Sequence, residues 1–103
     1  MTDERVTWGL ISKIRAKPRW RDALAVTLTE FYAAHTAPYA TVVVAEDAAD
    51  KDVVWVTQFW ESEAVHATIM VPDLLDAYGK SAALIERHEI EIVIRPVMEP
   101  VTV

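Results

Sequence analysis

Four short strand-like runs carry apolar residues on both of their faces, in a chain of only 103 residues. They cover residues 6–14, 39–46, 53–60 and 90–97. One sheet in a small domain needs a single apolar face, because its other face can meet water. Helices can cover one side of this sheet, and its other side then needs a partner. The pattern therefore predicts a homodimer that associates through the faces of its sheets.

The energetic argument for a dimer follows from the number of apolar side chains that a lone copy would expose. Burying one aliphatic side chain is worth about 1.5–3 kcal/mol. Several such residues left in water would forfeit more than the net stability of a small domain, which is about 5–15 kcal/mol. Association of two copies is the simplest remedy.

Two helices are predicted between these strands. The first covers residues 19–34, with Pro18 in its first turn and apolar side chains at helical spacing: Trp20, Leu24, Leu28 and Phe31. The second covers residues 63–70, with Ser62 as its N-cap. A further helical turn is expected within residues 81–87, ahead of the last strand.

The order β-α-β-β-α-β is that of a ferredoxin-like fold in the α+β class, with one antiparallel four-stranded sheet. The length fits a single domain over residues 1–103. Gly9 lies inside the first strand, which indicates a bulge or the close approach of another backbone segment or a ligand. The apolar tail, residues 97–103, is expected to reach across to the partner subunit.

Charge and cysteine content exclude several classes of function. The formal net charge is −6, so nucleic-acid binding is not expected, because a phosphate backbone requires a basic face. The chain has no cysteine, which excludes disulfides and thiolate catalysis and fits the reducing cytoplasm. No apolar run approaches 18 residues, so no membrane span is expected.

The basic residues nevertheless cluster near the end of the first strand: Lys13, Arg15, Lys17, Arg19 and Arg21. Two interpretations of this cluster stay open. It is either a solvated strand end with the first turn of a helix, or a patch that binds an anion.

No strong catalytic signature is present. The chain has no phosphate-binding glycine loop, no nucleophile elbow and no zinc-binding HExxH. Its three histidines, His35, His66 and His88, lie on different predicted elements, which argues against a metal site.

His66 is the residue with most chemical interest, because it follows a strand that ends on Trp60 and a helix cap at Ser62. An imidazole titrates near neutral pH, so it can accept a proton from a phenolic substrate. The alternative is structural: His66 fills the first turn of the helix and hydrogen-bonds a neighbour.

The segment Trp60, Ser62, Glu63-Ala64 and His66 resembles the antibiotic biosynthesis monooxygenase (ABM) family, in which a tryptophan, a serine and a short acidic, alanine-rich turn lead to a histidine. The order of strands and helices extends the resemblance over nearly the whole chain. The resemblance implies a ferredoxin-like protomer and a dimeric α+β barrel. It also implies a pocket between the sheet and the helices, and oxidation of aromatic polyketides or quinols with O2 without a metal or flavin.

The chain departs from family patterns in two places. Ala37-Pro38-Tyr39 stands where many members have a Pro-Gly-Cys type turn. The haem-degrading relatives need an asparagine on the first strand, and this chain contains no asparagine. Haem degradation is therefore not expected.

These observations predict a cofactor-independent monooxygenase that oxidises an aromatic, polyketide or quinol-type small molecule. The alternative functions are a non-catalytic small-molecule binding protein with the same barrel, and a structural module without a ligand. We expect His66 and Trp60 to be the catalytic pair, without a metal or cofactor. The residues expected to bind substrate are aromatic or imidazole side chains: Trp8, Phe31, Tyr32, His35 and Tyr78.

Overall fold

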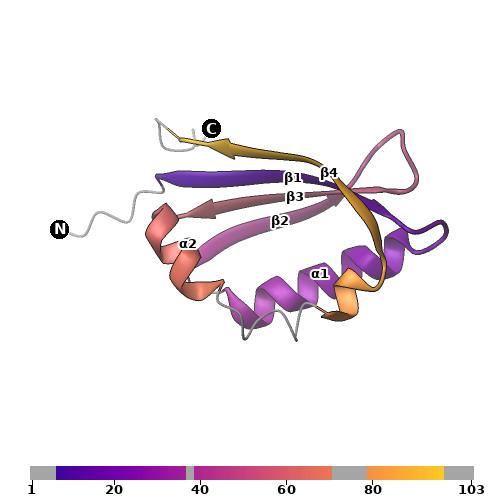
Figure 1. Cartoon of the computed structure of the whole chain (residues 1–103), viewed down its shortest axis with the longest axis horizontal. Coiled ribbons are helices and arrows are strands. Elements are labelled where there is room, and N and C mark those ends of the chain that lie inside the picture. Colours follow the sequence, from indigo (N-terminus) through magenta and orange to yellow (C-terminus); the bar gives the residue numbers. More distant parts are fainter. Residues whose placement is uncertain (1–6, 37–38, 71–78, 97–103) are drawn as a thin grey trace, which may run out of the picture.

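The computed structural model describes residues 7–36, 39–70 and 79–96. Its elements follow the order β1 (Trp8–Ala16), α1 (Arg21–His35), β2 (Ala40–Glu46), β3 (Val53–Trp60), α2 (Glu63–Ile69) and β4 (Ile85–Ile94). The strands form one antiparallel four-stranded sheet in the order β2-β3-β1-β4. Both helices lie on one side of this sheet, with α2 at one end of the strands (Figure 1). The ferredoxin-like fold expected from the sequence is confirmed.

The core lies between α1 and the sheet. Leu24 and Leu28 of α1 are fully buried and pack on the neighbouring strands, where Ile14, Val54 and Val56 are also buried. These strand residues have even numbers and lie on the same face of β1 and β3, because residues two apart point the same way. Even-numbered positions of β1, β2 and β3 therefore face the helices.

The start of α1 differs from the expectation. Pro18 and Arg19 form a turn before the helix, closed by a 2.9 Å hydrogen bond from the Trp20 N–H to the Lys17 carbonyl. Arg19 has φ 75°, which is the left-handed conformation of the third residue in a type II turn. Trp20 is 51% exposed and lies outside the helix, so its predicted place on the buried stripe was wrong.

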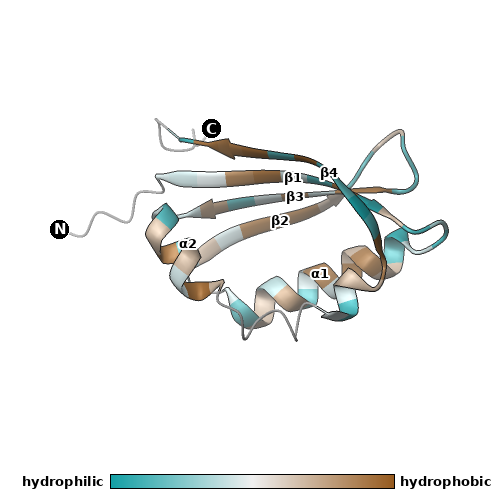
Figure 2. Ribbon diagram, in the orientation of Figure 1, coloured by the Kyte–Doolittle hydropathy of each residue, from teal (hydrophilic) through white to brown (hydrophobic). Residues whose placement is uncertain are grey.

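The last strand also differs from the expectation. β4 begins at Ile85 rather than at residue 90, and in the described chain the helix before it ends at residue 82. Ile85 pairs with Ala16, and the Lys17 N–H donates to the Leu84 carbonyl at 2.9 Å. The early part of β4 is polar, as Figure 2 shows by its change from hydrophilic to hydrophobic along the strand. It therefore lacks the apolar alternation by which strands are predicted.

Ion pairs hold this polar part of β4 against β1. Glu89 accepts a 2.6 Å hydrogen bond from Arg15 Nε and lies 3.5 Å from Lys13 Nζ and 2.9 Å from Arg87 Nη2. Arg15 also pairs with Asp50 at 2.8 Å. Arg15 and Lys13 of the predicted basic cluster are thus neutralised by carboxylates, which favours the first of its two interpretations for these residues.

The face of the sheet away from the helices is largely apolar. Odd-numbered residues of β1 to β3 form rows across it with Ile90, Ile92 and Ile94 of β4. The row nearest α2 contains Thr41, Phe59, Gly9 and Ile94, and the next contains Val43, Thr57, Ile11 and Ile92. Val43 is 52% and Ile92 47% exposed. This open face has the apolar character that the sequence predicts, while the dimer itself stays a prediction.

Within the described residues, no helix is long and apolar enough to cross a membrane. The cytoplasmic location expected from the cysteine content stays a prediction.

Gly9 is required by the close packing of β4 against β1. A Cβ atom at Gly9 would lie 2.8 Å from Ile94 Cγ1 and 3.0 Å from the Gln58 carbonyl oxygen. The close approach expected from the sequence is confirmed. We predict that Gly9→Ala lowers the free energy of unfolding by about 1–3 kcal/mol, the usual range for overpacking. Urea denaturation at one protein concentration measures this change.

Gly79→Ala is the matched control for this experiment. A Cβ at Gly79 meets nothing within 4 Å, and Gly79 has no positive φ. This variant should be neutral, or stabilising by about 0.4–1 kcal/mol through the unfolded chain. Equal effects of the two substitutions would contradict the packing argument.

Candidate functional site

Two tryptophans meet at the end of the central strand pair. Trp8 of β1 and Trp60 of β3 are directly opposite each other in the antiparallel register, and both face the helices. Trp60 is fully buried, while Trp8 is partly buried. Trp60 thus packs inside the fold, and its predicted part in chemistry stays a prediction.

A short helix places His66 on both indoles. Ser62 Oγ accepts a 3.1 Å hydrogen bond from the Val65 N–H and fixes the start of α2 two residues after the end of β3. The His66 ring centroid lies 4.6 Å from that of Trp8 and 5.0 Å from that of Trp60, which it meets edge-on. Trp8, Trp60 and His66 therefore lie together at this end of the sheet.

A buried polar residue connects this group to α1. Gln58 is 3% exposed, accepts a 3.0 Å hydrogen bond from Trp60 Nε1, and donates to Tyr32 Oη at 3.5 Å. Gln58 was not among the residues expected at the site. Its signal was a polar residue two positions before Trp60 in an otherwise apolar strand, and therefore on the same face.

Burial sets the acid–base character of His66. Half-burial on the two indoles lowers the pKa of the imidazole below its usual 6.5, and the charges of Glu91 and Glu63 partly oppose this shift. The neutral, proton-accepting form therefore dominates at neutral pH. Glu91 is a second residue that sequence reasoning missed, because only the pairing register shows which face of β4 it occupies.

The other predicted site residues form a second group on α1. Phe31 packs edge-on against Tyr32, with ring centroids 5.1 Å apart, and lies 5.0 Å from His35. Phe31 and Tyr32 belong to the buried core, and Tyr32 reaches the first group through Gln58. Tyr78 lies outside the described residues. A substrate-binding role of this second group stays a prediction.

A surface cavity of about 450 Å³ lies between α1 and β2, lined in part by Tyr32, Thr36 and Val42. It lies on the helix-facing side near the second group. His66 and the two indoles are not part of its lining in the described chain.

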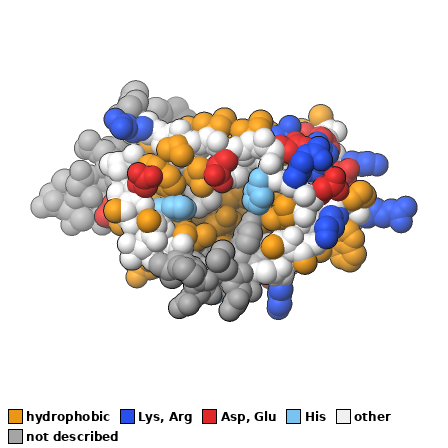
Figure 3. Space-filling view, viewed as in Figure 1, with side chains coloured by type: hydrophobic (Ala, Val, Ile, Leu, Met, Phe, Trp, Pro, Cys, Tyr) orange, Lys and Arg blue, Asp and Glu red, His pale blue; other side chains and the backbone are white. Residues whose placement is uncertain are grey.

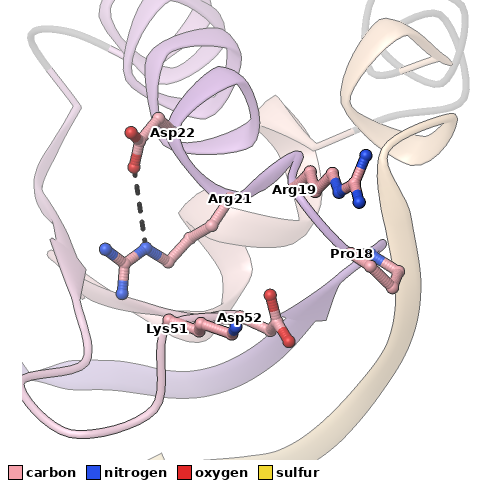
Figure 4. Close-up of a pocket in the computed structure, with 6 residues that line it drawn as sticks. All are labelled: Pro18, Arg19, Arg21, Asp22, Lys51 and Asp52. Atoms are coloured by element: carbon pink, nitrogen blue, oxygen red, sulfur yellow. Dashed lines mark ion pairs between the residues drawn. The ribbon is translucent and has the colours of Figure 1, made fainter.

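A second cavity, of about 390 Å³, lies at the N-terminal end of α1. It is lined by Pro18, Arg19, Arg21, Asp22, Lys51 and Asp52. Arg21 pairs with Asp22 at 3.7 Å and with Glu46 at 3.3 Å. Figure 4 shows the Arg19 side chain pointing away from Arg21 and Lys51. The cations do not converge on one point, which argues against the anion-binding interpretation of the basic cluster.

Among the described residues, no group of three or more histidine, aspartate or glutamate side chains could hold a metal ion. The expectation that neither metal nor cofactor takes part stays a prediction.

Comparison with known proteins identifies relatives among solved structures. A candidate antibiotic biosynthesis monooxygenase from Chloroflexus aurantiacus J-10-fl is 34% identical, with a TM-score of 0.79 over 91% of this chain and 96% of that chain. A candidate antibiotic biosynthesis monooxygenase from Bordetella bronchiseptica, 10% identical, has a TM-score of 0.74 over 91% of this chain and 100% of that chain. One from Nitrosomonas europaea, also 10% identical, has a TM-score of 0.73 over 88% and 99% of the two chains.

The two more distant structures show the fold alone. No protein-family model matches the sequence, and no curated protein is significantly similar to it. The likeness to the Chloroflexus protein, at 34% identity, extends over nearly the full length of both chains. On this evidence, the chain belongs to the antibiotic biosynthesis monooxygenase family.

Proposed function

We propose that this protein is a cofactor-independent monooxygenase that oxidises an aromatic, polyketide or quinol-type small molecule with O2. The observation that carries the proposal is the imidazole of His66, held against Trp8 and Trp60 and biased by burial towards its neutral form. Family membership supports the class of reaction. Indole rings next to a base suit a flat aromatic ligand, because aromatic faces and edges attract one another.

The chemistry needs one proton acceptor. Neutral His66 takes a proton from a phenol, or from the activated CH2 group of an anthrone-type substrate, and leaves an electron-rich anion. This anion transfers electrons to O2. In the anthrone case one oxygen atom becomes the new carbonyl oxygen, and the other leaves as water with the two hydrogens of the CH2 group.

We further propose that the functional unit is a homodimer formed through the open face of the sheet. The two rows nearest α2 on this face contain no charged residue, and Val43 and Ile92 are about half exposed. A second copy supplies a surface of the same apolar character, as expected for an isologous interface. Residues 97–103, proposed to cross to the partner, lie outside the described residues.

The first experiment measures O2 consumption by metal-free and flavin-free protein with a hydroquinone and an anthrone. We predict that His66→Ala lowers the rate at least about a hundredfold, the usual contribution of a general base. His88→Ala, an exposed histidine on β4, should leave the rate unchanged. Saturable binding without O2 consumption by the wild type would instead support a non-catalytic binding protein.

The pH dependence tests the role of His66 separately. Because burial lowers the pKa of His66 below 6.5, the rate should rise with pH through a midpoint below 6.5 and stay level above about pH 7. In His66→Ala the residual rate should instead rise towards the pKa of the substrate phenol, near 10. A wild-type midpoint above pH 7 would contradict the assignment of His66 as the base.

The dimer is tested with two matched substitutions. Val43 on the open face is 52% exposed, and Val26 on α1 is 56% exposed. We predict that Val43→Glu gives a monomer in sedimentation velocity at micromolar concentration, because burying an unpaired carboxylate opposes association. Val26→Glu should remain dimeric. A monomeric wild type, or a dimer in both variants, would rule out this interface.

A further inference from the structure

On the helix-facing side of the sheet, described residues of β4 are exposed beside the buried residues of β1. Leu10 pairs with Val93, and Ser12 pairs with Glu91, so these four residues share the face that carries Trp8. Leu10 is 8% and Ser12 is 5% exposed, whereas Val93 is 60% exposed. We call this surface the β1–β4 groove: its floor is buried on the β1 side and accessible on the β4 side.

The groove has a different polar group at each end. His66 lies over Trp8 at one end, and Glu91 lies beside Ser12 at the other. Trp8 and Ser12 are four residues apart on β1, which corresponds to about 14 Å along the strand. Side chains on this face stand roughly perpendicular to the sheet. An interval of this length suits one aromatic ring with a hydrogen-bonding group at each end.

Only apolar side chains lie between these two groups on the floor of the groove. The intervening pair is Leu10 and Val93. Figure 3 shows this side of the molecule hollowed, with hydrophobic side chains at the bottom and histidine and carboxylate side chains around it. A ring that lay on this floor would bury apolar surface and present its two ends to the imidazole and the carboxylate.

The negative charge of Glu91 acts on His66 at the other end of the groove. Its carboxylate raises the pKa of His66, and this effect is larger than that of Glu63, which lies on α2 itself. His88 occupies the next helix-facing position along β4, opposite Ile14. Glu91 is thus an acidic residue of β4 on the side of the sheet where His66 lies.

We propose that Glu91 determines which substrates the site accepts, by binding the end of the ligand that is remote from His66. The ligand class is a phenol whose opposite end carries a positive charge or a hydrogen-bond donor, and a phenol with a negatively charged end binds more weakly. The inference rests on the proposed function in one respect, because the hydroxyl is assigned to the His66 end. It goes beyond that function because it assigns a positive charge or a hydrogen-bond donor to the end of the ligand remote from His66.

Two probes that differ only in terminal charge test the proposal. Tyramine and 3-(4-hydroxyphenyl)propionate share the phenol ring and the two-carbon linker, and end in an ammonium and a carboxylate respectively. Isothermal titration calorimetry with the full chain, under nitrogen, gives both affinities without turnover. We expect the wild type to favour tyramine by about threefold or more, the scale of a partly exposed charge pair.

Substitutions then locate the source of this preference. Glu91→Gln should remove it, and Glu91→Lys should reverse it. Glu30→Gln is the control, because Glu30 is exposed on α1 and its substitution changes the net charge by the same amount. Retention of the preference in Glu91→Gln, its equal loss in Glu30→Gln, or no binding of either probe to the wild type would overturn the proposal.

The outcome is independent of oxygen chemistry. A protein that shows the charge preference but consumes no O2 retains the assignment of Glu91 and loses that of monooxygenase. A protein that consumes O2 without the charge preference retains the assignment of monooxygenase and loses that of Glu91. Circular dichroism of the Glu91 variants, which replace an exposed residue, checks that the chain remains folded.

Discussion

The pairing of β1 with β3 is the constraint on which the site depends. Its register places Trp8 opposite Trp60 at the strand ends and on the same face. α2 follows β3 after only two residues, and its Ser62 cap fixes where the first helical turn begins. His66 therefore meets both indoles. A shift of one residue in this register would turn one indole to the other face and remove half of that environment.

The two faces of the sheet serve different purposes. The helix-facing side carries the core under α1 and, beside it, the groove between His66 and Glu91. The open face carries two uncharged rows near α2 and a charged group at the other end of the strands, where Glu89 meets Lys13, Arg15 and Arg87.

Local patterns in the sequence predicted most of the fold, including the strand end and the helix on which the candidate site is built. The alternation in β3 and the cap at Ser62 were sufficient to place Trp60 and His66. The start of β4 was missed because its polar residues are held by ion pairs with β1, which have no local pattern. Glu91 was missed for a related reason: its face depends on the register with Ser12, a contact between distant parts of the chain. Gln58 could have been recognised from its spacing to Trp60.

The shortness of α2 has a consequence for how the site behaves in time. This helix covers only Glu63–Ile69, and none of its residues is buried. A helix of this length has little stability of its own and depends on its cap and on contacts with the sheet. Its amide hydrogens therefore exchange with solvent through local opening, well before those of the central strands. His66 therefore lies on a helix that can unfold and refold locally while the sheet stays intact.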